Sequence, residues 1–474
     1  MGAGAVDAGD ARRPPGPRRR LLGERARRRR LHGRDGRHPG RLLRLPVAGG
    51  RRRARDRPAH RAGADGARHR VGRDRGAVRR RGDPVIRPVN AAVLSSQWAP
   101  HVVAPPHDTF TPTTREQYLA QNPDSFMHVT DAPEHNVGHP SEHGIVAARS
   151  AAALSRLIDI GAYGAETGPH LFAQRIEVRG YTQNSLLGAV RTDEGALLPH
   201  EGTHSARVHG LAAHFAEVGL MSNPVVATCR STAAASAAIA AARERGHDAA
   251  VLDAETADGA RITLWSVDPD TAADLAGGSP LYIVDGHHRV AAAALAGFEQ
   301  VLVSIVPTDE LTLGSFDRVV SEITVMGRRI LDALADHCDV EEMPDHAAAT
   351  PSAPGSFGFG VGGGWYLARR RDLAAAGSPP TLDADFLHAE VLPALFDITE
   401  TSDSRLRYRP SVSASGVGDD DAGDDAVTIL VAPVPLEAIF DVADRGRTMP
   451  PKTTYLVPKA RSGLLLVPCQ AETG

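Results

Sequence analysis

LYIVDGHHRVAAAALAG, residues 281–297, joins an apolar run to an alanine-rich run. The apolar run is typical of a buried β-strand, and the alanine-rich run is typical of an α-helix that ends at Gly297. Other strand-like and helix-like runs alternate from residue 171 to residue 307. This alternation predicts an α/β fold built on a mixed sheet.

The junction inside this stretch holds five residues that suit a bound anion: Asp285, Gly286, His287, His288 and Arg289. A glycine lets a ligand approach the backbone, and the first turn of a helix offers unpaired N–H groups at the positive end of its dipole. The arginine adds a bidentate donor for phosphate. The same residues also fit an ordinary helix start, with an aspartate N-cap and two histidines that face solvent, and the spacing leaves both interpretations open.

A second polar motif, HEGTH, occupies residues 200–204 and matches the HExxH pattern of zinc proteases. That chemistry requires His200 and His204 one helical turn apart, with Glu201 beside them to hold the attacking water. A proline precedes the motif and Gly202 lies inside it, which disfavours a helix there. A zinc hydrolase is therefore a minor alternative.

Lys452 and Lys459 are the only lysines among the 54 basic residues of the chain. They lie in the segment MPPKTTYLVPKARSGLL, which also contains Thr453. Where arginine is so strongly preferred, a lysine indicates a place that needs a compact ammonium group. We expect this segment to fold back beside Arg289 and to bring an ammonium group to a bound phosphate. Two ordinary surface lysines are the alternative.

The first 84 residues differ from the rest in composition. They hold 27 Arg and only eight acidic residues, and they lack Ser, Thr, Lys, Ile, Phe, Tyr and Trp. Without apolar periodicity they cannot form a core. We interpret residues 1–84 as a disordered Arg-rich extension, or as GC-rich DNA translated in a wrong reading frame. A basic arm for nucleic acid or a membrane surface is the alternative.

The rest of the chain is acidic, because the net charge of the whole is −3. An acidic chain is a poor ligand for nucleic acid, whose phosphates require a basic surface. The three cysteines have no paired spacing, which fits a reducing compartment, and no apolar run approaches the roughly 20 residues of a membrane span. We expect a cytoplasmic protein that binds neither nucleic acid nor membrane. The sequence does not predict the oligomeric state.

Further elements follow from the apolar patterns. Helices are expected at residues 113–122, 205–220 and 231–247, and strands at 125–129, 223–229, 262–268 and 301–307. Residues 171–190 read as two strands about a Gly-Tyr turn. GFGVGG, residues 358–363, satisfies GxGxxG but precedes a strand-like run, so we predict a glycine-rich hairpin rather than a dinucleotide turn.

From Ile86 to Leu466 the chain resembles the bacterial family known as domain of unknown function 1015. The resemblance rests on RPVNAAV, VVAPPHD, NPDSFMHV, HEGTHSARV, ITLWSVD, LYIVDGHHRVAAA, LDADFLHAEVLPALF and MPPKTTYLVPKARSGL. The chain has His107 where the family usually has tyrosine. It has Asp317 where the family tends to show the histidine of a Pro-Thr-His-Arg run.

Residues 198–307 also resemble the core of the ParB and sulfiredoxin superfamily, in which a DGHHR-type loop holds nucleotide phosphates. Some members resemble this chain in both this loop and the His-Glu turn; they are kinases of free serine, and their glutamate is a general base. The catalytic cysteine of sulfiredoxins is replaced by histidine here. With the extension at 1–84 that the composition sets apart, the resemblance gives four parts: an α+β part at 85–197, the nucleotide-binding core at 198–310 and an α+β part at 311–474 follow the extension.

The resemblance implies a phosphotransferase that uses ATP or ADP and Mg²⁺ on a small hydroxyl compound such as serine. Glu201 would take the hydroxyl proton beside His200, and Asp285 would hold the metal ion. The phosphates would lie against the residues of the DGHHR loop and the C-terminal segment, namely Asp285, Gly286, His287, His288, Arg289, Lys452, Thr453 and Lys459. The alternative of a different class is a nucleotide-binding switch without catalysis.

Overall fold

The computed structural model describes residues 86–106, 109–130, 142–192, 195–269, 280–323, 327–371, 382–411 and 426–468. The predictions for residues 1–84 and for His107 fall outside these ranges. Helices and strands alternate through the described chain, and the strands form mixed and antiparallel sheets. The predicted α/β class is therefore confirmed.

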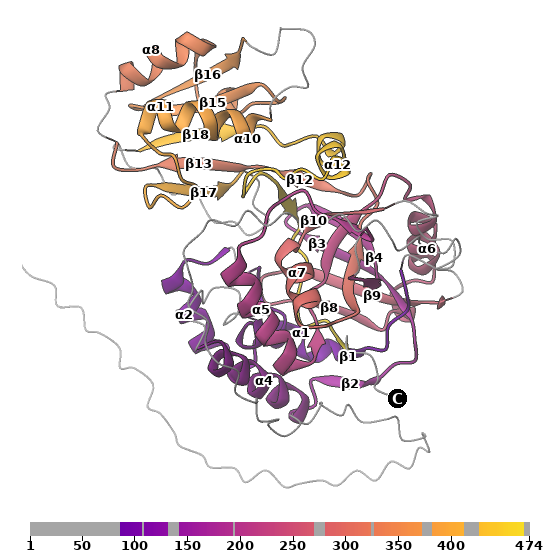
Figure 1. Ribbon diagram of the computed structural model, residues 1–474. Coiled ribbons are helices and arrows are strands. Elements are labelled where there is room, and N and C mark those ends of the chain that lie inside the picture. The colour runs from indigo at the N-terminus through magenta and orange to yellow at the C-terminus, as the bar shows by residue number, and fades with distance from the viewer. Residues whose placement is uncertain are drawn as a thin grey trace, which may run out of the picture. The chain divides into compact units, whose positions relative to one another are not determined.

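An eight-stranded mixed sheet, called the central sheet below, has the order β5-β10-β7-β11-β4-β3-β9-β8. Figure 1 labels its strands β3, β4, β8, β9 and β10. β10 runs parallel to β5 and β7 runs parallel to β11, while the other neighbours are antiparallel. The strands are β3 (Leu171–Val178), β4 (Tyr181–Arg191), β5 (Leu197–Leu198), β7 (Val225–Thr228), β8 (Leu252–Glu255), β9 (Arg261–Val267), β10 (Leu281–Asp285) and β11 (Gln300–Ile305).

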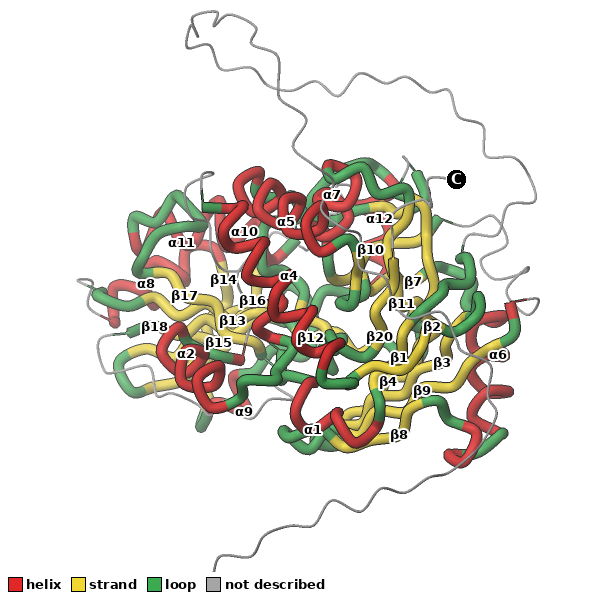
Figure 2. Tube along the Cα trace, turned by 90° about the horizontal axis from the view of Figure 1, so that it is seen from below, coloured by secondary structure: helices red, strands yellow, loops and turns green. Residues whose placement is uncertain are grey.

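Helices pack against this sheet and against one another. α5 packs against α4 and α7, as Figure 2 shows, and α6 contacts β3, β4 and β9. α5 ends at Val218, and the residue after it, Gly219, is left-handed with a φ of 73°, as is common after a helix. The helices are α1 (Ala99–Val102), α2 (Pro112–Gln121), α4 (His143–Asp159), α5 (Ser205–Val218), α6 (Ala233–Glu244) and α7 (His287–Leu295), with the 3₁₀ turns η1 (Ser96–Trp98) and η3 (His247–Ala249).

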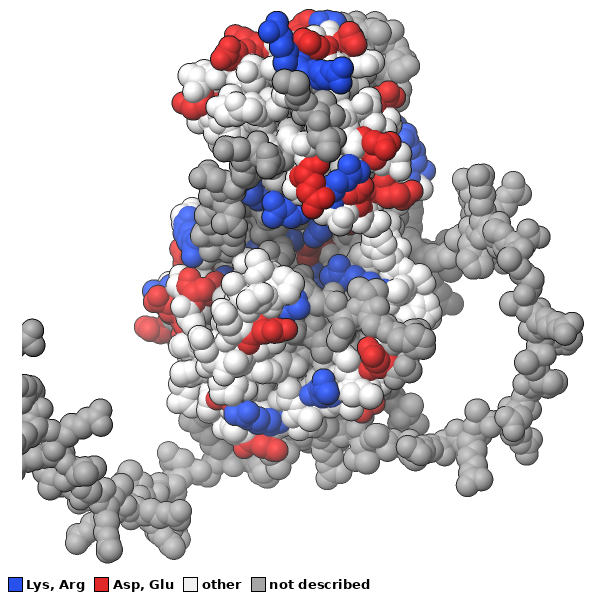
Figure 3. Space-filling model, turned by 90° about the vertical axis from the view of Figure 1, so that its left-hand side faces the viewer, with Lys and Arg blue, Asp and Glu red and all other residues white. Residues whose placement is uncertain are grey.

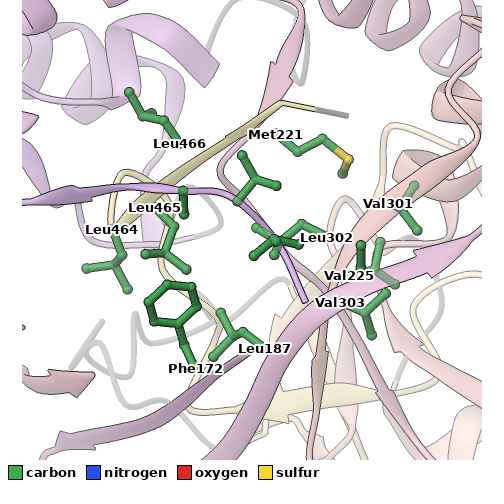
Figure 4. Close-up of a cluster of buried hydrophobic side chains, with 14 of the residues drawn as sticks. Phe172, Leu187, Met221, Val225, Val301, Leu302, Val303, Leu464, Leu465 and Leu466 are labelled. Carbon is green, nitrogen blue, oxygen red and sulfur yellow. The ribbon is translucent and has the colours of Figure 1, made fainter. Parts of the chain in front are cut away.

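The main core brings the end of the chain against the middle of the sequence. Figure 4 shows Phe172, Leu187, Val225 of β7 and the valines of β11 in one cluster with Leu464–Leu466. The last strand belongs to a four-stranded antiparallel sheet, β2-β1-β20-β6, made of β1 (Ala92–Leu94), β2 (Tyr163–Glu166), β6 (Leu220–Met221) and β20 (Leu465–Pro468). Burial of Leu464–Leu466 therefore fixes the C-terminal segment beside the central strands.

Residues 312–457 add a separate antiparallel sheet of six strands with its own apolar core. Its order is β14-β16-β15-β18-β13-β17, and a small pair, β12 with β19, lies apart from it. The elements are β12 (Thr312–Gly314), β13 (Phe316–Val320), α8 (Gly327–His337), β14 (Cys338–Met343), α9 (His346–Ala349), β15 (Ser356–Val361), β16 (Gly364–Arg370), α10 (Asp383–Phe386), the π-helical turn η6 (Leu387–Val391), α11 (Leu392–Phe396), β17 (Leu406–Pro410), β18 (Val427–Val431), α12 (Leu436–Asp444) and β19 (Tyr455–Val457).

Most of the predicted elements are confirmed, including the β3–β4 hairpin and the glycine-rich hairpin between β15 and β16. The strand predicted at residues 125–129 is wrong, because residues 127–130 are helical. Phe126 and Val129, three residues apart, are both buried there, and a helical turn places them on one face.

The predicted four-part division stays a prediction. The eight-stranded sheet takes β3 and β4 from one side of the boundary at residue 197, β5 spans that boundary, and the remaining strands come from the other side. No helix of the described residues is long and apolar enough to cross a membrane. The cytoplasmic location and the partners also stay predictions.

Candidate functional site

The DGHHR junction connects β10 to α7 through Gly286, which has a φ of 102°. L-residues rarely adopt this conformation. A β-carbon at Gly286 would lie 3.0 Å from the guanidinium group of Arg289. The glycine therefore allows both the turn of the backbone and the close approach of the arginine beneath it.

Arg289 is buried and its side chain points back into the protein. Its Nη1 donates to Asn223 Oδ1 at 2.5 Å and to the Pro224 carbonyl oxygen at 2.6 Å, and its Nη2 pairs with Asp285. Both terminal nitrogens are thus used by the protein itself. In this arrangement Arg289 holds the loop in shape and does not present the bidentate fork that the sequence suggested for phosphate.

The C-terminal segment folds back to the DGHHR loop, as expected from the sequence. Lys459 Nζ donates to Asp285 Oδ1 at 2.7 Å and lies 4.7 Å from the centre of the Tyr455 ring. Both carboxylate oxygens of Asp285 therefore accept from a cation, Lys459 on one side and Arg289 on the other. An ammonium group thus lies at the junction of β10 and α7.

The other residues of this segment have different surroundings. Lys452 is exposed, and its Nζ lies 4.8 Å from the centre of the Phe316 ring. The Thr453 hydroxyl donates to the Pro450 carbonyl oxygen at 2.6 Å, which closes a local turn. Thr453 is buried, so it stabilises the segment and does not offer its hydroxyl to a ligand.

His200 links the HEGTH turn to the central sheet from a fully buried position. Its Nδ1 lies 2.8 Å from the Ile283 carbonyl oxygen, so Nδ1 carries the hydrogen. Its Nε2 then accepts from the Thr454 hydroxyl at 3.2 Å. Burial lowers the pKa of His200 from 6.5 to about 4, so this imidazole is neutral at pH 7.

The two motifs also meet through two pairs of histidines. The His200 N–H donates to His287 Nε2 at 3.4 Å, with the two rings edge to face, and the His204 N–H donates to His288 Nε2 at 3.0 Å. Burial lowers the pKa of His288 to about 4 and that of His287 well below its usual value. Since each Nε2 accepts, each Nδ1 carries the hydrogen of a neutral ring.

The backbone around Glu201 is held in place by contacts with the backbone of Met449. It forms a parallel bridge with Met449, whose N–H donates to the His200 carbonyl oxygen at 2.7 Å. Burial raises the pKa of the Glu201 carboxyl group, and the charge of Asp285 raises it further, while Lys452, Lys459 and Arg207 act to lower it. A carboxylate with a raised pKa beside cations has the properties of a general base.

The charges around Glu201 favour a bound anion. Lys452, Lys459 and Arg207 all lie within electrostatic reach of it, against the single additional carboxylate of Asp285. Figure 3 shows basic and acidic side chains side by side on one face of the molecule, including the part where the surface is hollowed. This face therefore has no broad surface of basic side chains alone. A small anion matches such a local group of cations better than a long polyanion does.

The zinc alternative requires a helical turn that is not formed. Residues 199–204 have no helical structure, and α5 begins only at Ser205. Among the described residues, no group of three His, Cys, Asp or Glu side chains is placed to hold a metal ion. The expected Mg²⁺ role of Asp285 stays a prediction, because each of its oxygens accepts from one cation, Lys459 or Arg289, and keeps a second lone pair. We therefore derive no step through a metal ion held by the protein.

Two residues of the site had no clear signal in the sequence. Asn223 and Arg207 lie in stretches that read as a strand start and a helix face, and their contacts depend on the tertiary fold. The hydroxyl of Thr454, which the sequence offers as a donor beside that of Thr453, contacts His200 Nε2.

The fold and the site together define a mixed α/β protein with a carboxylate and several cations at one strand-to-helix junction. The sequence matches the family described as "Protein of unknown function (DUF1015)" over residues 86–390. This match spans more than half of the chain, and the protein belongs to that family, as its motifs indicate.

No curated protein matches the sequence. Among solved structures, SbnI with C-terminal truncation from Staphylococcus aureus is similar, with a TM-score of 0.36, 14% identity and coverage of 60% of this chain and 87% of that one. A free serine kinase mutant in complex with ADP has a TM-score of 0.33 and 15% identity, and covers 59% of this chain and 91% of its own. A conserved hypothetical protein from Pyrococcus furiosus has a TM-score of 0.30 and 17% identity, with coverage of 58% and 93%.

Proposed function

We propose that the protein is a nucleotide-dependent phosphotransferase that acts on a small hydroxyl compound, with serine or a related amino acid as the first acceptor to test. The observation that carries the proposal is the position of Glu201, a carboxylate with a raised pKa, among Lys452, Lys459 and the DGHHR turn. The resemblance of the same two motifs to those of free-serine kinases supports it.

In this proposal the phosphates of ATP or ADP lie against the start of α7. The backbone at Gly286 allows close approach, and the helix start provides N–H groups. The neutral rings of His287 and His288 add their Nδ1–H groups as donors. Lys459 and Lys452 supply positive charge, while Arg289 keeps the loop rigid from below.

The reaction needs positioning, charge neutralisation and a base. The acceptor hydroxyl oxygen attacks the terminal phosphorus of the nucleotide. A new P–O bond forms to the acceptor, while the P–O bond between the terminal phosphorus and the leaving nucleotide breaks. The leaving nucleotide keeps the electron pair of that bond, and the hydroxyl proton passes to a carboxylate oxygen of Glu201. His200 positions this turn through its bonds to Ile283 and Thr454 and takes no proton, because it is buried and neutral.

The experiment is an acceptor screen with labelled ATP or ADP and the full chain. The proposal expects nucleotide turnover that depends on a hydroxyl acceptor, with a phosphate ester as product. Nucleotide binding without turnover for any hydroxyl acceptor would instead favour the switch without catalysis. A nucleotide at a hundred times its dissociation constant adds about 2.7 kcal/mol to the free energy of unfolding, so a thermal-shift assay detects binding independently.

A further inference from the structure

Arg318 is a fully buried arginine on β13, in the six-stranded sheet. Its Nη1 donates to the Phe316 carbonyl oxygen, but its Nε and Nη2 have no hydrogen-bond partner among the described residues. In a guanidinium group the Nε–H and one N–H of Nη2 lie on the same edge of the planar group and point in the same direction. That edge is the one that binds the two oxygens of a carboxylate side by side.

No carboxylate of the strand compensates this charge on the same face. Asp317 precedes Arg318 in the strand, so its side chain points to the opposite face, from which its charge still acts on Arg318 without a hydrogen bond. There it accepts from the Val431 N–H at 3.3 Å and lies 3.7 Å from Arg409. Burial lowers the pKa of Arg318 to about 10, which still leaves the guanidinium group charged at pH 7. An unpaired charge in a protein interior is costly, so the free edge of Arg318 favours an anion.

Two further polar groups are also buried without a partner in the described structure: Tyr408 Oη and His388 Nε2. Tyr408 lies directly opposite Arg318 on β17, and the centre of its ring is 5.4 Å from the guanidinium carbon. His388 lies in the π-helical turn η6, and its pKa is lowered to about 4 by burial and then by the charge of Arg318. π-Helical turns occur frequently at functional sites.

We propose that Arg318, Tyr408 and His388 form a binding site for the carboxylate group of a small molecule. The carboxylate accepts two hydrogen bonds from the free edge of Arg318 and one each from the phenol and the imidazole. None of these residues belongs to the DGHHR site, so the proposal does not rest on the proposed function. Because Arg318 has no exposed surface, the ligand enters when η6 opens locally, and binding is slow.

The experiment measures the unfolding temperature of the full chain after long incubation with sodium acetate at constant ionic strength. We expect a saturable rise for the wild type. Arg318→Met should lose this rise while its unfolding temperature without acetate is at least that of the wild type, since an unpaired buried charge is removed. Tyr408→Phe, which keeps the ring, should require about fivefold more acetate because one hydrogen bond is lost.

Arg409→Met is the matched control, because Arg409 is the neighbour of Tyr408 on β17 and faces Asp317 on the other side of the sheet. It should respond to acetate as the wild type does. The proposal is overturned if acetate gives the wild type no saturable rise, or if Arg318→Met still responds. A rise with inorganic phosphate but not with acetate would also overturn it, because the site would then take a different anion.

Discussion

Gly286→Ala tests whether the DGHHR loop is built as the structure indicates. The φ of 102° is unfavourable for alanine, and a left-handed conformation costs an L-residue about 1–2 kcal/mol. The new β-carbon would in addition lie 3.0 Å from the guanidinium group of Arg289, which must then move. That movement weakens charge-assisted hydrogen bonds to Asp285, Asn223 or Pro224, each contributing about 1.5–3 kcal/mol. The expected loss in the free energy of unfolding is the sum of the two, roughly 2.5–5 kcal/mol.

Gly297→Ala is the matched control at the other end of the same helix. Gly297 is also left-handed, with a φ of 81°, but a β-carbon there meets no atom within 4 Å. This variant should lose only about 1–2 kcal/mol, which is the backbone cost alone. The difference between the two variants therefore measures the contact with Arg289.

The assay is equilibrium unfolding in urea, combined with nucleotide binding by calorimetry. Gly286→Ala should lose both stability and nucleotide affinity, and Gly297→Ala should keep its affinity. Equal stabilities of the two variants would refute the packing of Arg289 beneath the loop. Unchanged nucleotide binding in Gly286→Ala would refute the placement of the phosphates at this turn.

Three other predictions follow from the same site. Lys459→Met should weaken nucleotide binding at least tenfold in calorimetry, because it removes the ammonium group paired with Asp285; unchanged affinity would place the phosphates elsewhere. Lys452→Arg should lower turnover in the acceptor assay although it keeps its charge, since a planar fork does not replace a compact ammonium group, and a wild-type rate would contradict this. The free energy of unfolding should fall between pH 6.5 and pH 4 by about 3 kcal/mol for each buried histidine whose pKa is lowered to about 4, as for His200 and His288, because the unfolded chain binds protons that these rings do not; His200→Asn should make the fall about 3 kcal/mol smaller, and an unchanged pH profile would show that His200 does not contribute to it.

The local elements around the site were predictable because their apolar patterns are strong. The run before Asp285 and the alanine-rich run after Gly286 specify a strand and a helix whatever their surroundings. The return of Lys459 to this loop was also predictable, from the rarity of lysine and the need for cations. Residues 125–129 were less predictable, because a short apolar run fits a strand and a helical turn equally.

The directions of the polar side chains could not be predicted. Arg289 follows a glycine at a helix start, and this pattern is the same whether the guanidinium group points to a ligand or inward to Asn223. The inward direction depends on the carbonyl group of Pro224, which is 65 residues away in the sequence. Arg318 likewise reads as an ordinary strand residue until its burial and its unpaired nitrogens are known.

The most direct test of the central claim compares Glu201→Gln with the wild type in two measurements on the same preparation, nucleotide affinity and acceptor-dependent turnover. Gln keeps the size of the side chain but cannot take a proton at neutral pH. We expect an unchanged affinity and a turnover lowered by roughly 10²–10⁴-fold, the range of general-base catalysis. Glu217→Gln, on the exposed side of α5, is the control and should behave as the wild type. Wild-type turnover in Glu201→Gln would contradict the assignment of Glu201 as the base and, with it, the proposed reaction.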